Sequence, residues 1–188
     1  MQTSLDQALW AFGRGSGATA LAMLTVAVIT GIGSRSGRAL LLPRSGLAEL
    51  HRGAALIATV LVGVHVLSLL ADPYSQLHLL DTLVPFAGDY RPLWVGLGTV
   101  AVDLLVAIAL SALLRHRIGP RVFRVIHWAA YAFWPLALIH ALGAGTDAGR
   151  PWMLVIAAAC TLAVAAALAW RISGDFAEFG RTRERGIR

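Results

Sequence analysis

The 188-residue sequence contains little charge, a single cysteine and no lysine. Charged residues make up 14% of the chain, whereas soluble domains carry about 25%, so the low charge points to lipid as the surrounding solvent. Cys160 is the only cysteine, which excludes an intrachain disulfide and a zinc site built from several thiolates. The net charge of +6 does not indicate nucleic acid as a partner, because the arginines fall in short clusters between apolar runs.

Five apolar stretches approach the roughly 20 residues that a helix needs to cross the hydrocarbon core. They are residues Gly17–Gly33, Leu47–Leu70, Leu93–Leu114, Val122–Leu142 and Trp152–Trp170. The sequence therefore predicts an all-α, multi-pass protein of the cell membrane, with a bundle of five transmembrane helices over residues 1–171 and a basic tail over residues 172–188. In the longest loop, a short interfacial helix is expected around Gln76–Leu83.

The distribution of arginine predicts the orientation. Thirteen of the sixteen basic residues lie after the first, third and fifth spans or at the start of the second and fourth, and three (Arg14, Arg91 and Arg150) lie on the other side. Because cytoplasmic loops carry the excess of positive charge, the N-terminus is expected outside and the C-terminus in the cytoplasm.

Four of the six histidines lie inside predicted spans. His51 and His65 are 14 residues apart on the second span, and His127 and His140 are 13 apart on the fourth. At 1.5 Å per residue, each pair is separated by about 20 Å along its helix. Both spans run in the same direction, so His51 and His127 share the inner depth, and His65 and His140 share the outer depth.

Two helices that present histidines at two matched depths are suited to two stacked b-type haems, because each haem iron takes one axial imidazole from each helix. No C-x-x-C-H motif occurs, so the haems would be held without covalent bonds. Zinc or copper is the competing metal, but the separation of about 20 Å excludes one shared site. The alternative is that the four histidines are isolated polar residues packed between helices. The other two histidines, His78 and His116, lie outside the spans.

The angular spacing is unequal. At 100° per residue, a step of 14 leaves two side chains about 40° apart and a step of 13 leaves them about 140° apart. The fourth span therefore needs a distortion between its histidines. Pro135 lies between them, and proline removes a backbone donor and bends a helix.

The H-x13-H pattern followed by H-x12-H resembles the ferric reductase-like transmembrane domain, which is shared by ferric reductases, NADPH oxidases and the haem membrane subunit of the bacterial methionine-sulfoxide reductase system. The resemblance covers about Gly17 to Trp170. It implies a bacterial dihaem cytochrome b that moves electrons across the membrane. By analogy with the oxidases, Phe133 is expected between the haems, with ordinary packing as the alternative.

Two departures from that family limit the analogy. The chain ends 18 residues after Trp170, with no flavin and nicotinamide module, so the electron donor is expected to be a separate flavin protein or membrane quinol. Leu69 stands where the oxidases have a further histidine, which argues against a dedicated oxygen-reducing site. An outer protein or a ferric chelate is the expected acceptor.

Other charged residues carry weaker expectations. Arg52 and Arg124 at the inner haem, and Arg91 or Arg150 at the outer one, are candidates to pair with haem propionates. Asp103 lies in the middle of the third span, where a bare carboxylate is costly. It is expected to bond to Ser68 or Ser111, with a proton relay or quinol contact as the functional alternative.

The sequence thus favours the membrane electron-transfer subunit of an oxidoreductase. One alternative is a quinol-coupled oxidoreductase with its own substrate site, in which Asp103 handles protons. The other is a non-redox scaffold or transporter whose histidines bind protons or metal.

Overall fold

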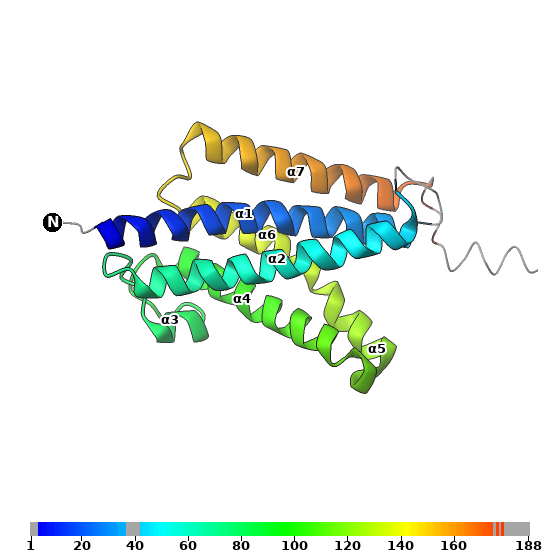
Figure 1. Ribbon diagram of the computed structural model, residues 1–188, viewed down its shortest axis with the longest axis horizontal. Helices are drawn as coiled ribbons and strands as arrows, with labels where there is room; N and C mark the ends of the chain where they lie inside the picture. The colour runs from blue at the N-terminus through cyan, green and yellow to red at the C-terminus, as the bar shows by residue number, and fades with distance from the viewer. Residues whose placement is uncertain (1–3, 37–41, 175, 177, 179–188) are drawn as a thin grey trace, which may run out of the picture.

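The computed structural model describes residues 4–36, 42–174, 176 and 178 (Figure 1). Within these residues the regular secondary structure is helical, apart from an isolated bridge between Ser36 and Glu178. The helices are α1 (Ser4–Arg35), α2 (Arg44–Ala71), α3 (Leu79–Leu83), α4 (Pro92–Leu113), α5 (Arg115–Trp128), α6 (Ala130–Ala144) and α7 (Pro151–Ile172).

Five helices are long and apolar enough to cross a membrane: α1, α2, α4, α5 together with α6, and α7. The prediction of an all-helical protein with five membrane spans is confirmed. The bundle has an arginine-rich end, where α1, α4 and α7 finish and α2 and α5 begin, and an arginine-poor end with the N-terminus, α3 and the α6–α7 loop (Figure 1).

The first span is longer than the hydropathy pattern predicts, because it begins at Ser4 and not at Gly17. Its early turns contain charged and polar residues, which lower the local hydropathy, yet Gly13 and Ser16 are buried there. The short helix α3 is also smaller than expected, since Gln76 has a φ of 55° and helix α3 begins only at Leu79.

Helix α1 lies at the centre of the molecule and packs against α2, α6 and α7, while α6 packs mainly against α4. Small residues along α1, including Gly13, Ala20 and Ala27, are buried and allow the neighbouring helices to approach closely, as is common in membranes. Helix α2 carries His51 and His65, α5 carries His127 and α6 carries His140. Helix α2 does not pack against α5 or α6 along their lengths.

The fourth span is broken between its two histidines. The N–H of Ala129 donates to the carbonyl of Ile126 at 2.9 Å, a tighter step than the α-helical one, and Ala129 separates α5 from α6. The distortion that the 13-residue spacing requires is therefore present, but it lies at Ala129. Pro135 lies six residues farther on, inside α6.

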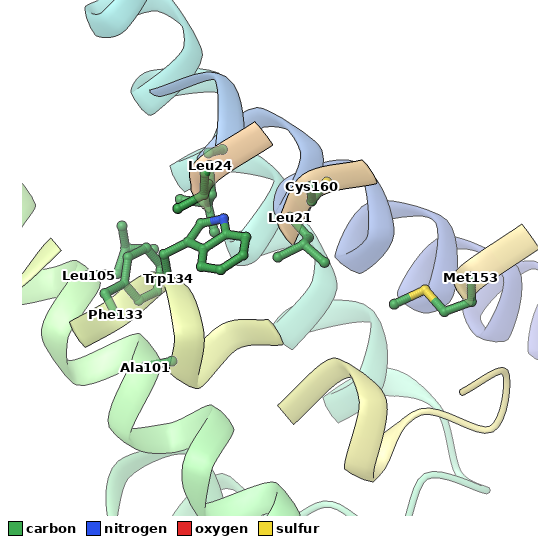
Figure 2. Packing of buried hydrophobic residues seen from close by; sticks show 10 residues of the cluster. Leu21, Leu24, Ala101, Leu105, Phe133, Trp134, Met153 and Cys160 are labelled. Atoms are coloured by element: carbon green, nitrogen blue, oxygen red, sulfur yellow. The ribbon is translucent and has the colours of Figure 1, made fainter. Parts of the chain in front are cut away.

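A buried apolar cluster fills the middle of the bundle, where Figure 2 shows Trp134 reaching from α6 toward Leu24 of α1. The indole Nε1–H of Trp134 donates to the hydroxyl of Thr25 at 2.9 Å. The Thr25 hydroxyl in turn donates to the carbonyl of Leu21 at 2.9 Å. This buried chain of hydrogen bonds joins the α1–α2 pair to the α4–α6 pair.

Replacing Trp134 with phenylalanine should destabilise the protein modestly, because it removes this bond and leaves the Thr25 hydroxyl satisfied by Leu21. Interhelical hydrogen bonds in membranes contribute about 0.6 kcal/mol on average, and some lost packing adds to this. We expect Tm in detergent to fall by a few degrees. Thr161→Ala is the control, since the exposed Thr161 hydroxyl bonds only within α7. An equal fall in Tm for both variants would contradict the assigned role.

Candidate paired-histidine site

Helix α2 positions His51 and His65 through hydrogen bonds to α1. The Nδ1–H of His51 donates to the carbonyl of Ala27 at 2.7 Å, and the Nδ1–H of His65 donates to the carbonyl of Gly13 at 2.7 Å. A carbonyl oxygen can only accept, so Nδ1 must carry the proton in both rings. In the neutral imidazole the lone pair is then on Nε2, which is the arrangement of a metal-binding histidine.

On the other side of the bundle, only one histidine is held in the same way. The Nδ1–H of His140 on α6 donates to the carbonyl of Trp94 on α4 at 2.8 Å. The Nδ1 atom of His127 is buried and has no hydrogen-bond partner among the described residues. The ring of Phe123 stacks on His127 instead, with the ring centres 5.2 Å apart.

The four rings form two facing pairs. The ring centres of His51 and His127 are 5.9 Å apart, and their planes are inclined at 83°. The ring centres of His65 and His140 are 6.3 Å apart, with the planes at 80°. The structure thus brings together the residues that the sequence pairs by depth.

These separations fit a single metal ion between each pair of rings. A metal–nitrogen bond of about 2 Å on either side, plus about 1 Å from nitrogen to ring centre, gives roughly 6 Å. Because Nδ1 carries the proton in His51, His65 and His140, the Nε2 atom of each ring has a lone pair that can bind a metal ion. The residues present therefore fit bis-histidine ligation of haem iron at two levels.

A glycine makes room for each of the three anchored rings. A Cβ atom at Gly17 would lie 2.9 Å from the His65 ring, one at Gly31 3.1 Å from His51, and one at Gly98 2.5 Å from His140. Each glycine follows the residue with the accepting carbonyl by four positions: Gly13 and Gly17, Ala27 and Gly31, Trp94 and Gly98. We call each such carbonyl and glycine a histidine seat.

The seats position three of the four paired histidines, and they were not predicted from the sequence. Gly17 and Gly31 are 14 residues apart, as are His51 and His65 on the antiparallel neighbour α2. This match of spacing was a detectable signal. Glycines in membrane-spanning helices are typical of close helix contact, but their presence alone does not indicate which side chain lies against them.

The charged candidates are dispersed. Arg52, Arg124 and Arg150 are exposed, and Arg91 donates to the carbonyl of Gly143 at 2.9 Å. At the arginine-poor end, Arg14 forms an ion pair with Asp147 and lies over the ring of Trp10.

The expected tie between Asp103 and a serine does not form. Asp103 is exposed on α4, while the Ser68 hydroxyl donates to carbonyls of its own helix and the Ser111 hydroxyl donates to Ile108. The prediction was wrong because the hydropathy pattern gives the depth of Asp103 and not the direction of its side chain.

Phe133 is buried, 5% exposed, and lies beside Leu105 of α4 in the central cluster (Figure 2). It packs in this cluster, and its expected place between two haems stays a prediction. No group of three or more His, Cys, Asp or Glu side chains suited to a metal ion occurs in the described parts of the chain.

Comparison with protein families matches residues 16–138 to the ferric reductase like transmembrane component. The matched segment includes His51, His65 and His127 and ends two residues before His140. Searches of curated proteins and of solved structures gave no match.

Filling a seat should destabilise the fold. Gly98→Ala places a methyl group 2.5 Å from the His140 ring, and such overpacking typically costs about 1–3 kcal/mol. Thermal unfolding in detergent should detect the loss. Gly63→Ala on α2 is the matched control, because a Cβ there meets nothing within 4 Å and alanine favours the helix. Equal stability of the two variants would show that the seat is not tight.

Proposed function

Because the chain belongs to the ferric reductase-like transmembrane component family, we propose that it is a dihaem b-type cytochrome that carries electrons across the membrane. The observation that supports this most directly is the pair of facing imidazoles at each of two levels, separated by 5.9 Å and 6.3 Å. His51 and His127 would hold one haem, and His65 and His140 the other. The haems would supply one-electron carriers at two depths of the membrane.

The chain's own residues prepare both sites for this task. The carbonyls of Ala27, Gly13 and Trp94 fix the tautomer and the direction of three rings. A hydrogen bond from Nδ1 also raises the basicity of a ligating imidazole. Apolar side chains such as Leu21, Leu24 and Leu105 fill the space in the middle of the bundle and exclude water from it.

The two-histidine pairs favour this role over a metal-transporting one. A structural or transported zinc ion usually takes four ligands, among them several His, Cys or carboxylate side chains, and the described residues gather no such group of three. A porphyrin supplies four equatorial nitrogens by itself, so two axial histidines are sufficient.

The direction of electron flow follows from the proposed orientation. With the arginine-rich end in the cytoplasm, electrons would enter at the His51/His127 level from a flavin protein or quinol and leave at the His65/His140 level. A cavity of about 380 Å³ lies at the arginine-rich end, lined by Arg115, His116, Gly119, Pro120 and Phe123. Since Phe123 also stacks on His127, this open pocket would give a donor an approach to the His51/His127 pair. The acceptor would be an outer protein or a ferric chelate.

The ligand assignment predicts the haem content of single variants. The protein purified in mild detergent should contain two haems per chain by pyridine haemochrome assay and show a b-type band in the reduced-minus-oxidised spectrum. His65→Ala should retain about half of that haem, because only the His51/His127 pair keeps both ligands. His78→Ala, at an exposed histidine before α3, should retain both haems. Absence of haem from the parent protein would refute the proposal, and full retention by His65→Ala would refute the ligand assignment.

The orientation predicts a labelling pattern in intact cells. In a Cys160→Ser background, Gly149→Cys in the exposed α6–α7 loop should react with a membrane-impermeant maleimide from outside. Ser45→Cys, exposed at the start of α2, should react only after the cells are lysed. The reverse pattern would show that the arginine-rich end faces outward.

A further inference from the structure

Arg171, in the last turn of α7, lies in a cage of aromatic rings. The guanidinium carbon is 5.6 Å from the ring centre of Trp128, 5.7 Å from that of Tyr131 and 5.7 Å from that of Phe176. Trp128 and Tyr131 lie on either side of the break in the fourth span, and their ring centres are 5.4 Å apart. Ring faces attract a cation, so the cage holds the charge of Arg171 in place.

The cage does not satisfy the hydrogen-bonding groups of Arg171. One terminal nitrogen, Nη1, is buried and has no partner among the described residues. A buried donor without an acceptor costs about 1–3 kcal/mol, and more when it is charged. Arg14, the other arginine with a buried nitrogen lacking a hydrogen bond, is at least neutralised by Asp147. The two ion pairs found among the described residues are Arg14–Asp147 and Arg35–Glu178, and neither includes Arg171.

The position of Arg171 relates it to the His51/His127 pair. Trp128, one of the cage residues, directly follows His127 in the chain, so the cage adjoins the histidine with the unsatisfied Nδ1. Two buried donors without partners, His127 Nδ1 and Arg171 Nη1, are thus gathered at the arginine-rich end. Arg52 and Arg124, the residues that the sequence suggests for a propionate, are both exposed there.

We propose that Arg171 and its aromatic cage form a binding site for an oxyanion, and that its ligand is a carboxylate of the cofactor held by His51 and His127. This inference rests on the proposed function. A guanidinium binds a carboxylate through two parallel N–H bonds, and the ring faces of Trp128 and Tyr131 offer no such acceptor, so Nη1 still requires one. The phosphate of an anionic lipid has the same oxyanion chemistry and is the competing source.

The test uses the reduction potentials of the haems in the full-length, detergent-purified protein. Arg171→Gln removes the cation that balances the carboxylate, so the oxidised, more positive haem is favoured. The reduced-to-oxidised ratio of the His51/His127 haem at a fixed solution potential should fall about tenfold, which is about 59 mV for a one-electron couple. The other haem should not change, and Arg171→Lys, which keeps the charge, should recover part of the shift.

The assignment of the two potentials comes from the His65→Ala variant, which should retain only the His51/His127 haem. Arg117→Gln is the matched control, because Arg117 is exposed at the same end of the bundle and should leave both potentials as they are. A lower Tm with both potentials unchanged would reduce Arg171 to a packing role and overturn the inference.

Lipid provides the second arm of the experiment. The Arg171→Gln shift should be the same in lipid-free detergent and in nanodiscs of phosphatidylcholine with or without phosphatidylglycerol. A shift seen only with phosphatidylglycerol would assign the site to lipid phosphate and overturn the carboxylate assignment. Absence of haem from the parent protein would instead refute the proposed function. If both haems are present and their reduction potentials are the same in the parent protein and in Arg171→Gln, only this inference is refuted.

Discussion

A histidine inside a membrane has two ring nitrogens to satisfy, and the arrangement of this bundle follows from how Nδ1 is satisfied. Water is scarce in the hydrocarbon core, so the partner must be a protein group. Backbone carbonyls of a helix normally bond to their own helix, and a second acceptor site on the same oxygen is reached only at close range. The seats at Gly13, Ala27 and Trp94 provide that range. The hydrogen bond at Nδ1 fixes the orientation of the ring and therefore the direction in which Nε2 points. In each pair the two rings face each other.

The same constraint explains why α1 is central and rich in small residues. One helix supplies two seats to α2, at Gly13–Gly17 and at Ala27–Gly31. An alanine at either glycine would push an imidazole out of its place. Close packing of α2 on α1, and of α5 and α6 on α4, holds the histidine-bearing helices separately, so α2 does not need to touch α5 or α6. The space between them is kept by two helix pairs, joined through Trp134 and Thr25.

The sequence was sufficient to predict the depth of a residue along its helix, but not the direction in which its side chain points. Hydropathy predicted the five spans, and residue spacing predicted which histidines pair, since depth along a helix is a simple count. The start of α1 at Ser4 was missed because its early turns are polar. Asp103 was assigned a serine partner, yet it is exposed on α4 and the two serines bond within their own helices. The need for a distortion between His127 and His140 was predicted, but its position was not. Pro135 was the expected cause because proline bends helices, whereas nothing in the sequence around Ala129 indicates the break that occurs there.

The two levels of the bundle are not equivalent, and the missing fourth seat shows why. His140 uses Trp94 and Gly98 of α4. His127 lies thirteen residues earlier on an antiparallel span, and the same step along α4 leads from Gly98 to Ser111. Ser111 is buried and has a side chain where a seat requires none. With no glycine to lie against, His127 keeps Nδ1 unsatisfied and relies on Phe123 for contact. Its ring is therefore less constrained than the other three, and electrostatic groups nearby have more influence on whatever it binds. Arg171 has a buried nitrogen without a hydrogen-bond partner at that end of the bundle, so the end with the weaker histidine anchor is also the end with an arginine that still requires an acceptor.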